Sequence, residues 1–171
     1  MKKLLILGAG GYGKTVADLA SQLGIYDKIA FLDDGRTGEG ILGGCGEFRT
    51  FADEDTQMYP AFGNNAVRMA WLNRLVDCGI SVPTLVHPRA YVSPEARIEA
   101  GTVVLPMAVV NTGVTVKMGS IINIGTLVDH DSVIEPGCHL APGAIVKAEN
   151  RIAAGSKIES GTVIENREFP L

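Results

Sequence analysis

The second half of the sequence repeats a hydrophobic pattern every six residues. The column begins at Val86, and every member is aliphatic and most are β-branched. Its members are Val86, Val92, Ile98, Val104, Val110, Val116, Ile122, Val128, Ile134, Leu140, Val146, Ile152, Ile158 and Ile164. An α-helix cannot bury such a column on one face, because positions six apart are rotated by about 240° around its axis. The period therefore excludes a helical origin for this half of the chain.

A second column lies four residues further on in each hexad and is nearly all small, from Ala90 to Thr162. A coil of three short flat strands explains both columns, since each hexad then forms one side of a triangle with its aliphatic residue inside. Residues 18 apart stack in such a coil, which places Val86, Val104 and Ile122 in one interior ladder. Strands of a β-sandwich require a two-residue alternation that this segment lacks. The pattern predicts a parallel β-helix over residues 84–171.

The first half shows α/β patterning instead, and we assign residues 1–83 to a separate Rossmann-like domain. A buried strand over residues 2–7 is followed by the turn Gly8-Ala9-Gly10-Gly11-Tyr12-Gly13 and by a helix. The helix places Val16, Leu19, Ala20 and Leu23 on one face. A second strand over residues 29–32 ends in Asp33-Asp34, about 20 residues after the glycines. This is the spacing of a dinucleotide fingerprint, in which a phosphate approaches the glycine backbone at the helix N-terminus.

The size of this domain limits what the fingerprint can hold. A complete dinucleotide fold needs two mononucleotide halves, whereas only about 80 residues precede the repeat. A single nucleotide diphosphate suits the domain better than NAD, and glycines that merely form a tight turn remain an alternative. A strand over residues 57–62 leads to Gly63-Asn64-Asn65 and a helix with Val67, Trp71, Leu75 and Cys78 inside. We expect Asn64 or Asn65 to cap that helix.

Composition narrows the class of function. Hydrophobic residues make up 46% of the chain and charged residues 20%, with a net charge of -4, so no basic face is available for nucleic acid. The cysteines Cys45, Cys78 and Cys138 form no C-x-x-C pair, which favours a reducing compartment. The apolar run from Leu4 to Leu7 is too short for a signal peptide or a membrane span. We expect a cytoplasmic protein without membrane insertion.

The repeat resembles the left-handed β-helix of the hexapeptide-transferase superfamily. The glycine-rich start, Phe31-Leu32-Asp33-Asp34, Phe62-Gly63-Asn64-Asn65, Asn123 and Val128-Asp129-His130-Asp131 together resemble the sialic acid O-acetyltransferases and the bacillosamine-type UDP-sugar N-acetyltransferases. The resemblance covers nearly the whole chain. It implies a Rossmann-like domain that binds a UDP-linked amino sugar, a β-helix that binds acetyl-CoA, and a homotrimer. It implies no metal.

By position, the resemblance assigns the general base to His130 and its orienting carboxylate to Asp131. It assigns acetyl-CoA contacts to Asn123, His139 and Ala148, the last of which would offer its N–H to the oxyanion. The nucleotide-sugar contacts fall on the first glycine turn, the acidic pair and the second turn. These residues are Gly8, Gly10, Gly11, Tyr12, Gly13, Asp33, Asp34, Gly63 and Asn64.

Two features depart from the family pattern. Many relatives carry histidine where Tyr12 stands, which leaves the identity of the acceptor sugar open. Relatives also continue for at least one more coil that helps hold the adenine of CoA, whereas this sequence ends at Leu171, and we expect weaker CoA binding. A nucleotide-sugar-binding scaffold without transferase activity is therefore the non-enzymatic alternative.

The residues themselves also support a direct acetyl transfer. His130 lies two positions past inward-facing Val128, so it is expected at an outward corner, where an imidazole can accept a proton from an amine or hydroxyl. A solvated corner histidine without a role is the alternative. Cys138 falls in the small-residue column and is interpreted as packing, and His87 as structural. A β-helical carbonic anhydrase would need three converging histidines, but His87 lies more than two coils from the others.

Overall fold

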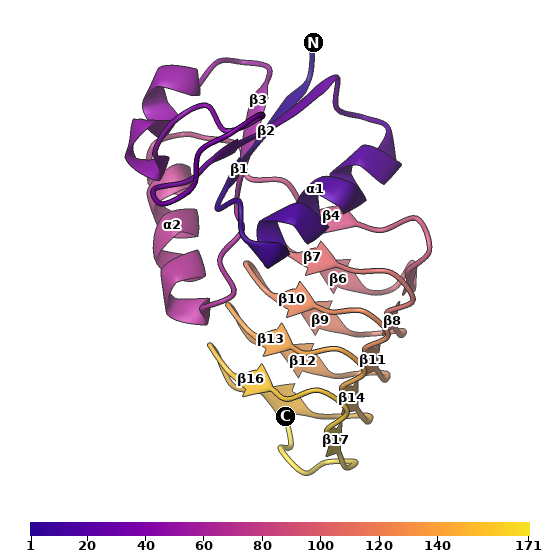
Figure 1. The fold of residues 1–171 in the computed structure, drawn as a ribbon. Helices are drawn as coiled ribbons and strands as arrows, with labels where there is room; N and C mark the ends of the chain where they lie inside the picture. The colour runs from indigo at the N-terminus through magenta and orange to yellow at the C-terminus, as the bar shows by residue number, and fades with distance from the viewer. The chain divides into compact units, whose positions relative to one another are not determined.

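The computed structural model describes residues 1–171, which divide into two compact units, Met1–Pro83 and Thr84–Leu171. The first unit is a parallel sheet with helices on both sides (Figure 1). Its strands are β1 (Lys3–Leu7), β2 (Lys28–Leu32) and β3 (Thr56–Pro60), in the order β2-β1-β3. The α/β pattern of this half is thus confirmed, with strand ends shifted by one or two residues.

Alternate residues of the central strand serve the two faces of the sheet. Leu5 and Leu7 pack in one apolar cluster with the 3-10 helix η1 (Cys45–Phe51) and with Leu75 of α2 (Asn65–Asp77). Helix α1 (Gly11–Leu23) lies on the other side of the sheet in Figure 1. Its buried residues are Gly13, Val16, Leu19 and Ala20, which confirms the predicted apolar stripe except at its partly exposed end.

The predicted inner face of α2 is wrong at its first turn. Val67 is exposed, and the buried residues of this helix are Arg68, Leu72 and Leu75. The Arg68 guanidinium donates to the Phe62 carbonyl at 3.0 Å, so a hydrogen-bonded charge occupies the inward position that the apolar pattern gave to its neighbour. Of the two candidate caps, Asn64 is the one used, because its side chain accepts from the Val67 N–H at 3.0 Å.

The second unit is a left-handed parallel β-helix, as predicted. Each coil contributes one two-residue strand to each of three parallel sheets, ordered β16-β13-β10-β7-β4, β17-β14-β11-β8-β5 and β15-β12-β9-β6. The strands are β4 (Leu85–Val86), β5 (Tyr91–Val92), β6 (Arg97–Ile98), β7 (Val103–Val104), β8 (Val109–Val110), β9 (Thr115–Val116), β10 (Ile121–Ile122), β11 (Leu127–Val128), β12 (Val133–Ile134), β13 (His139–Leu140), β14 (Ile145–Val146), β15 (Arg151–Ile152), β16 (Lys157–Ile158) and β17 (Val163–Ile164).

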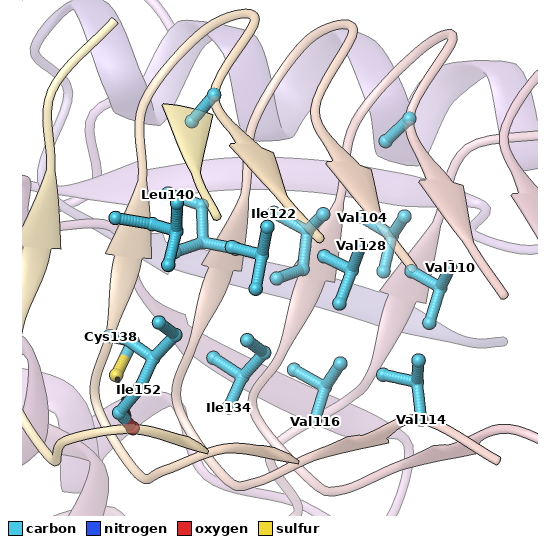
Figure 2. Packing of buried hydrophobic residues seen from close by; sticks show 14 residues of the cluster. Val104, Val110, Val114, Val116, Ile122, Val128, Ile134, Cys138, Leu140 and Ile152 are labelled. Carbon is cyan, nitrogen blue, oxygen red and sulfur yellow. Dashed lines mark hydrogen bonds between the residues drawn. The ribbon is translucent and has the colours of Figure 1, made fainter. Parts of the chain in front are cut away.

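The interior ladders follow the predicted register. Ile122 pairs with Val104 on one side and with Leu140 on the other, each 18 residues away. Figure 2 shows these side chains in one row inside the coil and those of Val116 and Ile134 in another. The small column also points inward, and Cys138 within it is fully buried, which confirms its interpretation as packing. The stacked coils thereby hold each corner of the triangle at a fixed position.

Candidate active site and nucleotide site

The corner after β11 presents His130. Val128 at the end of that strand is buried, while the side chain of His130, two residues on, is 45% exposed. Its Nδ1 lies 2.8 Å from Oδ2 of Asp131. With the Nδ1 proton donated to that carboxylate, Nε2 retains its lone pair. The predicted outward corner is confirmed, and the arrangement suits a proton acceptor.

The charges around His130 are all acidic. The hydrogen bond to Asp131 is the main cause that raises the pKa of His130 above its usual range, and the carboxylates of Asp129 and Glu149 act in the same direction. Partial burial opposes them. A raised pKa makes the imidazole a stronger proton acceptor, and it stabilises the imidazolium that forms when the proton arrives.

The backbone of His130 is held on both sides. Its N–H donates to Oδ1 of Asp129 at 2.8 Å, and its carbonyl accepts from the Glu149 N–H at 3.1 Å. Asn111, one coil earlier, donates from Nδ2 to the same Asp129 oxygen at 2.9 Å. Neither Asn111 nor Asp129 was predicted to support the site, although their 18-residue separation places them one above the other.

This corner also contains unusual backbone conformations. Asp131, Glu149 and Arg167 stack at successive coils, and all three are non-glycine residues with positive φ, of 56°, 58° and 54°. The equivalent residue one coil earlier is Gly113, and a Cβ there would lie only 2.3 Å from Oδ1 of Asp131. Left-handed conformations of ordinary residues cost roughly 1–3 kcal/mol each and concentrate at functional sites. Met107 is the one such residue at another corner of the β-helix, so these strained conformations are concentrated at the corner of His130.

Asn123 and His139 form a second pair at another corner. Nδ2 of Asn123 lies 3.0 Å from Nε2 of His139, and Oδ1 of Asn123 accepts from the Ile124 N–H at 2.8 Å. Because the Asn123 oxygen is engaged there, its amide nitrogen faces the imidazole and donates to Nε2. Asn123 thus orients the ring of His139. Ala148 lies one coil beyond His130 and is 4% exposed.

In the first unit, the glycine turn joins β1 to α1. Gly8 adopts φ of 102°, and a Cβ on Gly13 would lie 1.9 Å from the Gly8 carbonyl oxygen, so neither position accepts a side chain without rearrangement. Gly10 precedes the helix in extended conformation and provides no side-chain cap. The first N–H groups of α1 therefore lie at a glycine-rich turn, an arrangement that is typical of phosphate sites.

Asp33 and Asp34 have structural roles that the sequence did not reveal. Oδ2 of Asp33 accepts from the Ala9 N–H at 2.7 Å, and Oδ1 accepts from the Gly35 and Arg36 N–H groups at 2.9 and 2.8 Å. These hydrogen bonds, led by that from Ala9, lower the pKa of Asp33. Asp34 accepts from the Cys45 N–H at 2.7 Å. Asp33 thus fastens the glycine turn to the loop after β2.

A cavity of about 410 Å³ opens beside this turn. Lys14 and Arg36 line it together with Ala9 and Phe31, and Glu39 is its one acidic lining residue. Two cations next to a helix N-terminus favour a diphosphate, and the aromatic ring offers a surface for a base or sugar. Sequence reasoning missed Lys14 and Arg36, although Lys14 directly follows the glycine turn.

The remaining predicted contacts lie in the first turn of α1 and in the loop after β3. Oη of Tyr12 lies 2.8 Å from Oη of Tyr59, and the two rings meet edge to face. Burial raises the pKa of Tyr59 to about 12 and that of Tyr12 well above its usual range, so both hydroxyls keep their protons at neutral pH. Gly63 precedes the capping residue Asn64 and is exposed.

Three further observations concern metal ligands, His87 and the lengths of the helices. No group of three or more His, Cys, Asp or Glu side chains is placed to hold a metal ion. His87 is buried, and its Nδ1 accepts from the Arg89 N–H at 3.0 Å, which agrees with a structural role. Neither α1 nor α2 has the length and hydrophobicity that a bilayer-spanning helix requires.

Comparison with known proteins identifies relatives for both halves of the chain. Residues 3–75 match the family described as the PglD N-terminal domain. The UDP-N-acetylbacillosamine N-acetyltransferase of Bacillus subtilis (strain 168) is 35% identical over 113 residues, which cover 61% of this chain and 52% of that protein. The chain thus spans about half the length of this curated relative.

Solved structures extend the similarity over the whole chain. The acetyltransferase domain of PglB from Neisseria gonorrhoeae FA1090 is 37% identical with a TM-score of 0.95, covering 98% of this chain and 84% of that one. The same domain in complex with acetyl coenzyme A gives the same identity and TM-score over 97% and 83%. A variant of perosamine N-acetyltransferase from Caulobacter crescentus, bound to CoA and GDP-perosamine, shares the fold at 22% identity and a TM-score of 0.77, covering 98% and 92%.

Proposed function

The chain belongs to the hexapeptide-repeat sugar acetyltransferases, and on that premise we propose that it transfers the acetyl group of acetyl-CoA to an amino group of a nucleotide-linked sugar. The observation that carries the proposal is the His130–Asp131 pair at a strained, outward corner of the β-helix. A solvated histidine without a role would not need a carboxylate hydrogen-bonded to its Nδ1. The names of the relatives agree, since they are N-acetyltransferases.

In the proposed reaction His130 acts as general base. Its Nε2 accepts a proton from the acceptor amine while the amine nitrogen forms a bond to the thioester carbonyl carbon. The C–S bond then breaks, and the CoA thiolate leaves and takes the proton from Nε2 of His130, which returns the imidazole to its neutral form. Asp131 orients the ring through Nδ1 and stabilises the imidazolium. No covalent acyl-enzyme is required, and buried Cys138 takes no part.

The thioester oxygen becomes negative during the attack and needs a donor. We assign this role to the N–H of Ala148, one coil beyond His130, with Asn123 and His139 as further acetyl-CoA contacts. A backbone donor held by stacked coils is fixed before the reaction begins, which is what makes such donors effective. Removing one donor of this kind from an enzyme typically lowers the rate on the order of 10²–10³-fold.

The first unit is proposed to bind the nucleotide sugar. The glycine turn from Gly8 to Gly13 and the N-terminus of α1 would receive the diphosphate, with Lys14 and Arg36 as counter-charges in the adjoining cavity. A UDP-linked amino sugar is our first candidate. Tyr12, Gly63 and Asn64 remain proposed contacts, whereas Asp33 and Asp34 would support the site through the loops they fasten.

We also propose that the protein is a homotrimer in which neighbouring copies complete the acetyl-CoA site. The outward residues of the sheet that contains β11 form an apolar ladder along successive coils. They are Tyr91, Val109, Leu127, Ile145 and Val163, and three of them are exposed. A contiguous apolar strip on a surface is typical of an interface. This strip leads directly to the corner of His130.

The first prediction tests the base. His130→Ala should abolish acetyl transfer, measured as thiol release from acetyl-CoA, while binding of a UDP-sugar measured by calorimetry stays nearly unchanged, because the nucleotide contacts are proposed in the other unit. Full transfer activity in the variant would rule out this mechanism. Screening UDP-amino-sugars against free sialic acid in the same assay distinguishes N-acetylation of a nucleotide sugar from O-acetylation of sialic acid.

Calorimetric titration with acetyl-CoA separates the enzyme from the scaffold alternative. Saturable binding in the micromolar range agrees with a transferase. No binding at millimolar acetyl-CoA would instead indicate a nucleotide-sugar-binding scaffold.

A further inference from the structure

At each corner of the β-helix, one particular backbone N–H takes no part in the hydrogen bonds that join successive coils. It belongs to the second residue after each strand, where the chain has left the sheet. A buried N–H that lacks an acceptor is costly, so its partner must be identified at every corner. At the corner of His130, the Thr112 N–H donates to Oδ1 of Asn111 at 2.8 Å, and the His130 N–H donates to Oδ1 of Asp129 at 2.8 Å. In both cases the residue just before supplies the acceptor.

The corresponding corner positions in the rest of the β-helix fall into three classes. Many have no N–H, because the residue is proline. Two more are paired with side chains, the Ile124 N–H with Asn123 and the Met118 N–H with Glu99. Others lie on exposed residues where water can pair with them. The prolines are Pro88, Pro94, Pro106, Pro136 and Pro142, and the exposed residues are Ala100, Ala154, Ser160 and Asn166.

Ala148 fits none of these classes. It is 4% exposed, yet its N–H donates to no acceptor within the protein, while its carbonyl accepts from the Arg167 N–H at 3.3 Å. The reason lies in the residue before it. Lys147 occupies the position of Asn111 and Asp129 in the stack, but an ammonium group has donors only, and it pairs with Glu165.

We propose that Lys147 is a positioning residue of the acetyl transfer, because by supplying no side-chain acceptor it leaves the Ala148 N–H available to the thioester oxygen. Asp129 and Lys147 therefore have opposite effects. Asp129 accepts from the N–H of the base, which must be held still, whereas Lys147 leaves the N–H one coil further on without an acceptor. The inference rests on the proposed function, in which this N–H stabilises the oxyanion. It concerns the side chain that controls the donor rather than the donor itself.

Lys147→Asn tests the proposal. Asparagine should accept from the Ala148 N–H in the way that Asn111 accepts from the Thr112 N–H. Because the oxyanion would then lose its donor, kcat should fall on the order of 10²-fold, with the KM for acetyl-CoA within about twofold. Lys147→Met is the matched control, since it also removes the ion pair with Glu165 but supplies no oxygen. It should retain kcat within about threefold.

Amide hydrogen exchange gives a readout that is independent of turnover. The Ala148 amide should exchange more slowly in Lys147→Asn than in the parent chain or in Lys147→Met, while the His130 amide stays equally protected in all three. Slow exchange in Lys147→Asn combined with an undiminished kcat would overturn the inference. Equally slow exchange in the parent chain would also overturn it, since the N–H would then already have an acceptor.

Different results would contradict the proposed function and the proposed role of Lys147. A parent chain that releases no thiol with any acceptor would contradict the proposed function. An active parent chain for which Lys147→Asn and Lys147→Met have the same kcat would leave the proposed function standing and would refute the role of Lys147.

Discussion

At the scale of single residues, His130 combines an outward side chain with a backbone held at both ends. Its N–H donates a hydrogen bond to Asp129 and its carbonyl accepts one from the Glu149 N–H, and these two hydrogen bonds fix its peptide planes. The hydrogen bond to Asp131 fixes its ring. A base positioned in this way loses little conformational freedom when substrate arrives. The strained conformation of Asp131 is the cost of placing a carboxylate next to the imidazole at a tight corner.

Substitution of Asp131 should change the pH dependence of the reaction. The base must be neutral, so kcat/KM rises with pH through the pKa of His130, which Asp131 holds above its usual range. Asp131→Asn removes the charge but tolerates the left-handed backbone. The acidic limb of the kcat/KM profile should therefore move to lower pH, with a lower plateau because the ring is less well oriented. An NMR titration of His130 should move in the same direction, and an unchanged limb would contradict the assignment.

Asp33 and Asp34 in the first unit show that residue type and spacing alone do not determine what a carboxylate binds. Their spacing from the glycines predicted a contact with the nucleotide, whereas the oxygens of Asp33 accept three backbone N–H groups. The cations Lys14 and Arg36 were missed because a single lysine or arginine has no spacing signature. Only the folded loop brings both to the same cavity.

At the scale of elements, the β-helix derives its stability from ladders of β-branched residues. Each two-residue strand turns one side chain inward and one outward. A substitution of the outward residue can therefore serve as the control for a substitution of the inward residue in the same strand. Ile134→Ala in β12 should destabilise the protein by about 2–5 kcal/mol, because it removes fully buried methyl groups and leaves a cavity in the coil. Val133→Ala in the same strand faces outward and should cost clearly less.

Urea denaturation at a fixed protein concentration measures both variants, since association shifts apparent stability. Equal midpoints for Ile134→Ala and Val133→Ala would contradict the inward and outward assignment of this strand.

The helices were harder to predict than the coils. The stripe of α1 was largely correct because aliphatic residues mark it. The stripe of α2 was wrong at its first turn, because the inward residue there is Arg68, whose buried guanidinium is paired with backbone and side-chain oxygens. A periodicity of apolar residues cannot identify a buried charge that owes its place to hydrogen bonds.

At the scale of the whole molecule, the proposed trimer explains why apolar side chains follow the outer face of one sheet. Val163 on this strip is 42% exposed, and Val76 on α2 is 47% exposed, so the two form a matched pair. Val163→Asp should weaken association, because the interface would bury a charge, whereas Val76→Asp should leave it unchanged. Sedimentation velocity of the parent chain should give three times the chain mass, and a monomer would contradict the proposal.

The sequence by itself determined the β-helix, its register and the outward corner of His130. These follow from a strict period, because stacking residues 18 apart leaves only one arrangement in which every aliphatic residue is inside. It also indicated the family, which the comparisons with known proteins then showed. The spacing of residues along the chain was sufficient to predict the structure wherever one repeated contact, between residues 18 apart, determines it.

Only the tertiary structure decided which groups are engaged and which remain available. It showed that Asp33 holds a turn, that Asp129 occupies the N–H of His130 and that the N–H of Ala148 has no acceptor. The physical reason is that hydrogen-bond satisfaction depends on the direction of each donor and acceptor. Residue type sets what a group can do, and the fold sets whether another group of the chain has already used it.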